Sequence, residues 1–394
     1  MKKYCCYILL IIVYYSLICD NNLIYADSLN LNPLTELGVI KYKNFEGGLF
    51  PNGMNIVPDN HLLIGQSVLQ NIQPRDNSGN LDMTNGKIVF LSVGMSNTTQ
   101  EFSTFKQLAD TLKNKNPKLI IVDGAQGGQT AAIIQNPSAT FWEIINQRLS
   151  TVKLSPQQVQ VVWLKEADIS PQNNFPIHAQ TLTNELKKVC QVIKSKYPNT
   201  MMCFVSSRIY GGYASSSLNP EPMAYESGFS VKWLVDAQIN QDTALICTGS
   251  NPKVPWISWG PYLWANGLKA RNDGLTWAVS DFVTSDGTHP STSGRLKVAN
   301  LLVDFFTSNN LTIPWFQKSP TEVEDWYNSE IKIFPNPASD AIYINSSYKY
   351  YEIYNSFGQK VHSGIADSKI DITCFDRGVY FIRTGAVVRG FIKE

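Results

Sequence analysis

A serine, an aspartate and a histidine stand at positions where they could carry out acyl transfer. Ser96 follows the apolar run 87–93 at an expected strand-to-helix turn, so its backbone N–H would face a developing oxyanion. Asp286 precedes His289 by three residues on a glycine-containing turn, where the carboxylate can hold one ring nitrogen while the other takes a serine proton. Helix capping is the alternative interpretation of both Ser96 and His289.

The histidines of the chain favour one general base. Of the four, His362 lies in a C-terminal segment of different texture, His61 lies in an irregular N-terminal segment, and His178 opens an expected helix. His289 alone follows an aspartate at the spacing that orients an imidazole, and it is therefore the predicted base.

The elements around these residues alternate between strands and helices. Compact apolar runs predict four strands and a weaker fifth, and amphipathic patterns predict the helices between and after them. Such alternation is typical of a parallel sheet covered on both faces, in which sites collect at the carboxyl ends of the strands. The predicted strands are 87–93, 118–122, 159–164, 200–205 and 244–247, and the predicted helices are 102–112, 141–149, 179–196, 221–238 and 291–308.

The order of these blocks resembles that of SGNH (GDSL-like) hydrolases over about residues 85–310. The resemblance rests on Gly94-x-Ser96-Asn97, a glycine-rich turn after the second strand, a polar turn after the third, and Asp286-x-x-His289 before the last helix. The Gly-x-Ser-Asn form is similar to carbohydrate acetylesterases of that superfamily. The resemblance implies an α/β fold with a flavodoxin-like three-layer α/β/α parallel sheet, and it implies no cofactor or metal.

The resemblance also implies roles for individual residues. Ser96 would be the nucleophile, His289 the general base and acid, and Asp286 the group that orients it. The backbone N–H of Gly127 or Gly128 would complete an oxyanion hole with that of Ser96.

The turn after the third strand departs from the family pattern. Lys165 stands where a glycine is usual and Ala167 where an asparagine would donate, although Glu166 matches one variant. Lys165 or Gln126 could replace the missing donor, whereas a solvated strand end is the alternative interpretation of Glu166 and Asp168. The predicted oxyanion and substrate-binding residues are Asn97, Gln126, Gly127, Gly128, Lys165, Glu166 and Arg208.

An aromatic stretch, 255–264, precedes the Asp-His turn. Trp256 and Trp259 are a possible platform on which a sugar stacks, with core packing as an equal alternative.

Both ends of the chain predict export. Lys2, Lys3 and a short apolar run indicate a signal peptide over 1–26, cleaved after Ala26, and a lipid anchor at Cys19 is disfavoured by Ile18. Residues 331–394 predict a small antiparallel β-sandwich domain. Within it, segments 333–340, 353–360 and 376–382 resemble the C-terminal sorting domain of the type IX secretion system of Bacteroidota. This implies contact with that secretion machinery and a location outside the cell or on its surface; an ordinary carbohydrate-binding β module is the alternative.

The remaining boundaries and the composition complete the prediction. Residues 27–86 would form an irregular arm packed on the main domain, residues 87–311 the hydrolase domain, and residues 312–330 a linker.

With 33 Lys and Arg against 32 Asp and Glu, the chain lacks the basic excess of a nucleic-acid-binding protein. No cysteine spacing suits a metal knuckle, and buried free thiols are expected at Cys190, Cys203, Cys247 and Cys374.

These features together predict a secreted serine esterase that removes acyl groups, such as O-acetyl, from a carbohydrate or another extracellular ester. The alternative is a catalytically silent protein of the same fold that binds glycans or serves at the cell surface.

Overall fold

The computed structural model describes residues 31–169, 173–318, 332–345, 350–365, 369–384 and 387–394. The predicted signal peptide, with Cys19, and most of the predicted linker lie outside the described residues. The chain divides between Gln317 and Lys318 into two compact units.

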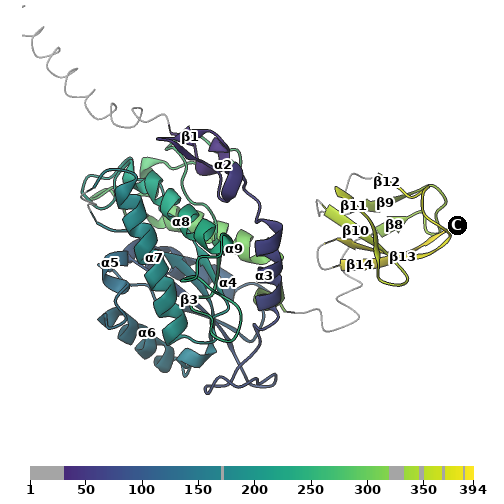
Figure 1. Ribbon diagram of the computed structural model, residues 1–394, viewed down its shortest axis with the longest axis horizontal. Helices are drawn as coiled ribbons and strands as arrows, with labels where there is room; N and C mark the ends of the chain where they lie inside the picture. Colours follow the sequence, from purple (N-terminus) through teal and green to yellow (C-terminus); the bar gives the residue numbers. More distant parts are fainter. Residues whose placement is uncertain (1–30, 170–172, 319–331, 346–349, 366–368, 385–386) are drawn as a thin grey trace, which may run out of the picture. The chain divides into compact units, whose positions relative to one another are not determined.

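The first unit is built on a five-stranded parallel sheet (Figure 1). Its strand order, β4-β3-β5-β6-β7, places the first strand of the sheet between the second and third, which is the flavodoxin-like order. The predicted α/β class is thus confirmed. The strands are β3 (Ile88–Gly94), β4 (Leu119–Asp123), β5 (Val159–Lys165), β6 (Met202–Val205) and β7 (Trp256–Trp259).

Helices lie on both faces of this sheet, which fits strands that are mostly apolar and buried. On one face Phe90 of β3 packs against Phe102 and Phe105 of α4 and Phe306 of α9. The helices of the unit after residue 90 are α4 (Ser96–Asp110), α5 (Ala131–Ile134), α6 (Thr140–Thr151), η3 (Pro156–Gln158), α7 (Ile177–Lys196), α8 (Met223–Ile239), η4 (Val279–Asp281), α9 (Thr292–Ser308) and α10 (Ile313–Phe316).

The fifth strand was predicted at the wrong place. Residues 244–247 form a turn and loop, whereas β7 is the tryptophan-rich segment Trp256–Trp259. Aromatic residues fit a pleated, buried surface, so this run belongs in the sheet.

The N-terminal arm is less irregular than predicted. It contains α2 (Leu34–Leu37), β1 (Lys41–Tyr42), β2 (Phe45–Glu46), η2 (Pro51–Gly53) and the three-turn helix α3 (Asp59–Leu69). Its contacts hold it on the first unit, since the Trp256 and Trp259 indole N–H groups donate to the His61 and Leu49 carbonyls at 3.0 and 2.6 Å.

The first unit also runs beyond the predicted boundary at residue 311. Trp315 and Phe316 of α10 are buried in its core, so residues 312–317 are not linker.

The second unit consists of two antiparallel sheets around their own apolar core, with strand orders β11-β10-β13-β14 and β12-β9-β8. The predicted antiparallel β architecture is confirmed. The strands are β8 (Lys332–Phe334), β9 (Ala341–Asn345), β10 (Tyr350–Asn355), β11 (Lys360–Ile365), β12 (Lys369–Asp371), β13 (Gly378–Thr384) and β14 (Val387–Lys393).

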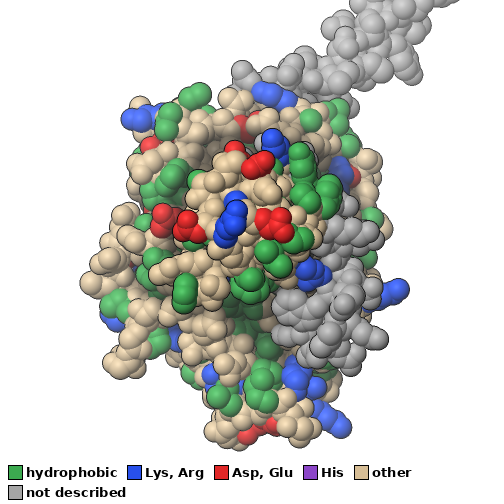
Figure 2. Space-filling view, turned by 90° about the vertical axis from the view of Figure 1, so that its right-hand side faces the viewer, with side chains coloured by type: hydrophobic (Ala, Val, Ile, Leu, Met, Phe, Trp, Pro, Cys, Tyr) green, Lys and Arg blue, Asp and Glu red, His purple; other side chains and the backbone are tan. Residues whose placement is uncertain are grey.

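Acidic and basic side chains are interspersed over the face shown in Figure 2. This distribution matches the near balance of charge in the sequence. Among the described residues, no helix combines the length and the hydropathy that a membrane crossing requires.

Candidate active site

Ser96, His289 and Asp286 lie together at the carboxyl end of the parallel sheet, and we call them the triad cluster. The Ser96 Oγ is 2.7 Å from the Nε2 of His289, and the Nδ1 of the same ring is 2.7 Å from an Asp286 carboxylate oxygen. The structure thus brings together three of the predicted site residues, which are separated by up to 193 positions in the sequence.

The junction of β3 and α4 positions Ser96. Met95 has the extended backbone of a helix N-cap and Ser96 is the first helical residue, so Ser96 is not the cap that the alternative interpretation proposed. Gly94 is required here, since a Cβ at this position would lie 2.2 Å from the Lys165 carbonyl oxygen. The first N–H groups of a helix lack partners within the helix, so the Ser96 N–H is suited to an oxyanion.

The Asp286 turn is held rigidly. One carboxylate oxygen of Asp286 accepts the backbone N–H groups of Thr288 and His289 at 2.8 and 2.9 Å, and the other oxygen faces the ring. Burial alone would raise the pKa of Asp286, but these donors hold it below its ordinary value. The carboxylate thus stays ionised and fixes the His289 tautomer.

Asn97 supports this turn from the helix side. Its buried side-chain amide donates to the Thr288 carbonyl at 3.0 Å, which ties the start of α4 to the turn that carries His289. The residue borders the site, as predicted, and its observed contact is one of positioning.

The glycine-rich turn after β4 lies beside Ser96. A Cβ added to Gly127 would stand 3.9 Å from the Ser96 Cβ, and Gly128, with a φ of +73°, lines the pocket in front of Ser96. Gln126 does not reach this pocket with its side chain, because its amide donates to the Gly124 and Phe141 carbonyls. The prediction of Gln126 as a substitute donor is wrong.

The turn after β5 differs most from the prediction. Lys165 is fully buried and its ammonium binds both carboxylate oxygens of Glu101 in α4, at 2.6 and 2.5 Å. Lys165 therefore cannot serve as an oxyanion donor. Burial raises the pKa of Glu101 and lowers that of Lys165 to about 8, against the mutual attraction of the pair.

Glu166 is not solvated either. It is 2% exposed, one of its oxygens accepts the backbone N–H of Ala167, and burial raises its pKa well above the usual range. Glu166 is therefore not a solvated strand end, and it is not among the residues that line the cavity in front of Ser96.

The triad cluster opens into a cavity of about 200 Å³. Met95, Ala167, Ile169 and Leu218 give it apolar walls, and Arg208 and Asn219 contribute polar groups. Asn219 was missed by sequence reasoning; its only signal was the Asn-Pro pair that marks a turn before α8. The remaining lining residues are Ser96, Asn97, Gly128, Gln129, Thr130, Asp168, Thr288 and His289.

The proposed sugar platform is wrong. Trp256 is fully buried and Trp259 is 4% exposed, and both lie on β7 inside the core. The core-packing alternative is the one observed.

The four cysteines within the described residues are free thiols. Cys190 and Cys203 are buried, as expected, whereas Cys247 is half-buried and Cys374 is exposed.

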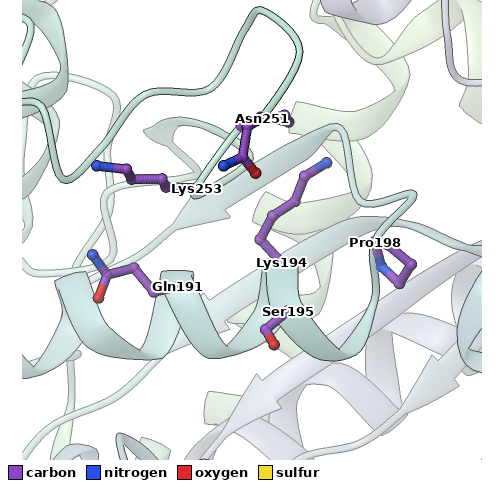
Figure 3. A pocket seen from close by; sticks show the side chains of 7 residues that line it. Gln191, Lys194, Ser195, Pro198, Asn251 and Lys253 are labelled. Carbon is purple, nitrogen blue, oxygen red and sulfur yellow. The ribbon is translucent and has the colours of Figure 1, made fainter.

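A larger hollow of about 550 Å³ lies at the end of α7 (Figure 3). Among the described residues that line it there is a serine, Ser195, but no histidine to activate it. Burial lowers the pKa of Lys194, which lines this hollow, to about 8, and its ammonium donates to the Thr200 carbonyl. Nothing in this lining matches the geometry of the triad cluster.

Comparison with solved structures finds distant similarity. The similar structures include a protein assigned as an acylhydrolase from Bacteroides fragilis, with 14% identity over 63% of this chain and 97% of that chain and a TM-score of 0.34. They also include a gut microbial diltiazem-metabolising enzyme, with 11% identity over 73% of each chain and a TM-score of 0.35. A carbohydrate acetylesterase from Xanthomonas citri has 8% identity over 77% of this chain and 78% of that chain, with a TM-score of 0.30. At such identities and scores, the likeness assigns no activity to this chain. A search of curated proteins gave no match.

The second unit gives a definite result. Residues 332–390 match the family model described as a secretion system C-terminal sorting domain. This confirms the resemblance of the three segments in the tail, and it overturns the alternative of an ordinary carbohydrate-binding module. The chain therefore ends in a sorting domain of the type IX secretion system, which directs it to the cell surface or the extracellular space.

Proposed function

We propose that the first unit is a serine esterase of SGNH type that removes short acyl groups, such as O-acetyl, from a carbohydrate outside the cell. The observation that carries this proposal is the continuous hydrogen-bonded line from Ser96 through His289 to Asp286, with both bonds at 2.7 Å. This line has the geometry required of a nucleophile, its base and the group that orients the base.

The reaction would proceed in two steps. The Ser96 Oγ attacks the ester carbonyl carbon while His289 takes its proton, and the Ser96 N–H with that of Gly127 or Gly128 stabilises the oxyanion. Collapse breaks the ester C–O bond, and His289 returns the proton to the leaving alcohol. Water, deprotonated by His289, then attacks the acyl-serine and releases the carboxylic acid and free Ser96.

The size of the cavity supports a small acyl group. Its volume of about 200 Å³ is below the range of about 300–1,000 Å³ that is typical of small-molecule sites. The apolar walls formed by Met95, Ile169 and Leu218 suit a short alkyl chain better than a charged one at that side. The carbohydrate part of the proposal rests on the family resemblance and on the extracellular location.

The test is hydrolysis of p-nitrophenyl acetate by the purified full-length chain, together with labelling by a fluorophosphonate. We expect turnover and a label on Ser96, and both should be lost in Ser96→Ala. Ser103→Ala is the matched control, because Ser103 lies two turns further along α4 and its hydroxyl donates to the Gln100 carbonyl at 3.3 Å. Turnover that persists in Ser96→Ala, or a label on another residue, would refute the assignment.

The catalytically silent alternative keeps one supporting observation, namely that Lys165 and Glu166 are withdrawn into the protein. A wild-type chain that is neither labelled nor active, yet binds a glycan equally well with and without Ser96→Ala, would establish it.

A further inference from the structure

Arg208 is a buried cation in the wall of the catalytic cavity. It follows β6 at the carboxyl end of the sheet, it is 2% exposed, and it lines the same cavity as Ser96 and His289. Its Nη1 lies 3.5 Å from the Sδ of Met95, the residue that precedes the nucleophile. The side chain therefore reaches the cavity close to the reacting serine.

The guanidinium lacks the partners that such burial normally demands. Within the part of the chain that the structure describes, the Nε and Nη2 of Arg208 have no hydrogen-bond acceptor, and the residue forms no ion pair. Burying a charge without a partner is strongly unfavourable, so an acceptor absent from the apo chain is the natural explanation. Nε and Nη2 form one edge of the guanidinium, which is the edge that binds a carboxylate through two parallel hydrogen bonds.

The carboxyl groups near Arg208 are already engaged or favour their neutral form. Glu101 binds Lys165, Asp286 binds His289, and burial favours the protonated form of Glu166. Glu221 accepts the N–H groups of Gly211, Tyr225 and Trp264. None of them reaches the free edge of Arg208 at hydrogen-bond distance, so the charge remains available to a ligand.

Two further features of the cavity restrict the ligand. Arg208 is the only Lys or Arg among the described lining residues. The acidic residue of the same lining, Asp168, accepts the backbone N–H of Ala132 at 3.0 Å and forms no ion pair with Arg208. Asn219 has a buried Oδ1 without a hydrogen-bond donor, while its Nδ2 donates to the Asp168 carbonyl at 2.9 Å. An acceptor beside a cation fits a ligand that presents both a hydroxyl and a carboxylate.

We propose that Arg208 recognises a carboxylate on the substrate, so that the enzyme selects esters of acidic molecules over neutral ones. This inference rests on the proposed esterase function and specifies its substrate class. The carboxylate belongs either to the alcohol part, as in an O-acetylated sugar acid, or to the acyl part, as in a dicarboxylic half-ester. The cavity is small, so the carboxylate lies only a few atoms from the ester carbon.

The test compares matched charged and neutral esters with the full-length chain. For the alcohol part, acetate release is measured from 3-O-acetyl-glucuronic acid and from its methyl ester. For the acyl part, p-nitrophenyl hemisuccinate is compared with p-nitrophenyl butyrate. We expect kcat/KM to favour the acid in one of the two pairs by about 10- to 100-fold, the range of a charge-assisted hydrogen bond. The pair that shows the preference identifies the source of the carboxylate.

Variants of Arg208 separate substrate recognition from other roles. Arg208→Gln should lower kcat/KM for the acidic ester more than for its neutral partner and bring their ratio close to one. Arg208→Lys, which keeps the charge but not the two parallel N–H donors of the guanidinium, should retain part of the preference. Arg271→Gln is the control, because Arg271 is also buried but is paired with Asp273 and does not line the cavity.

The outcomes are distinguishable from a failure of the proposed function. Wild-type protein that hydrolyses the neutral ester as well as the acidic one in both pairs would overturn the inference and leave the esterase intact, and this measurement does not depend on the folding of any variant. An equal loss for both esters in Arg208→Gln would also overturn it, because Arg208 would then act on the reacting centre. Absence of turnover and of fluorophosphonate labelling would instead overturn the esterase proposal itself.

Discussion

Asp286→Asn should nearly abolish catalysis while leaving the fold intact. Asparagine can keep the acceptor for the Thr288 and His289 N–H groups, but it places an NH₂ group opposite His289 Nδ1, at the present 2.7 Å contact. The ring must then carry its proton on Nε2, which would donate to Ser96 instead of accepting from it. By analogy with other triads, we expect kcat/KM to fall by about 10³- to 10⁴-fold, or about 4–5.5 kcal/mol of transition-state stabilisation.

The assay is p-nitrophenyl acetate hydrolysis, with the free energy of unfolding measured by urea denaturation. Asp286 is 24% exposed, so its loss of charge should change the unfolding free energy by less than about 1 kcal/mol. Asp281→Asn is the control: Asp281 lies just before the same turn, but it binds Lys297 and Ser293 and not the triad cluster. A decrease of less than tenfold in Asp286→Asn, or an equal decrease in Asp281→Asn, would refute the reasoning.

Four further outcomes follow. Gly94→Ala should lower both activity and the unfolding temperature, because its Cβ would lie 2.2 Å from a carbonyl oxygen of β5. Trp256→Ala should lower the unfolding free energy by about 3–5 kcal/mol, as expected of a core residue, in a urea titration. Burial and a hydrogen bond with a neighbouring carboxyl raise the pKa of Glu185 to about 8. The free energy of unfolding should therefore decline as pH rises from about 4.5 through 8, and Glu185→Gln should flatten that decline in thermal melts. Lys165→Met should cost about 3–5 kcal/mol by leaving Glu101 buried without its cation, and adding Glu101→Leu should recover part of the loss.

The sequence predicted the sheet and the triad cluster because their signals are local or follow from topology. Continuous apolar runs mark buried parallel strands, and the carboxyl ends of such strands share one edge of the sheet. Ser96 follows the first of these strands, and the spacing of Asp286 and His289 on a tight turn sets their mutual contact. The relation between Ser96 and His289 then follows from the order of the blocks, without knowledge of any side-chain packing.

The direction of a side chain at a strand end cannot be predicted in this way. Lys165 and Glu166 are charged, and such residues are seldom fully buried without a partner, so a sequence pattern assigns them to the site or to solvent. The actual position of Lys165 depends on Glu101, which lies 64 residues earlier on a different element. For Trp256 the sequence left two interpretations open, because an aromatic run has the same composition in a binding cleft and in a strand.

Lys165, at the end of β5, also has a structural consequence at Ser96. Lys165 pairs with Gly94 in the sheet, and its carbonyl accepts the Thr98 hydroxyl at 2.6 Å in the first turn of α4. Its ammonium binds Glu101 one turn further along the same helix. One residue thus fixes two successive turns of the helix that begins with Ser96. In the proposed esterase, an oxyanion donor would be effective only when the nucleophile and the donor are held in place, so we expect a residue that braces α4 to contribute to the site without touching the substrate.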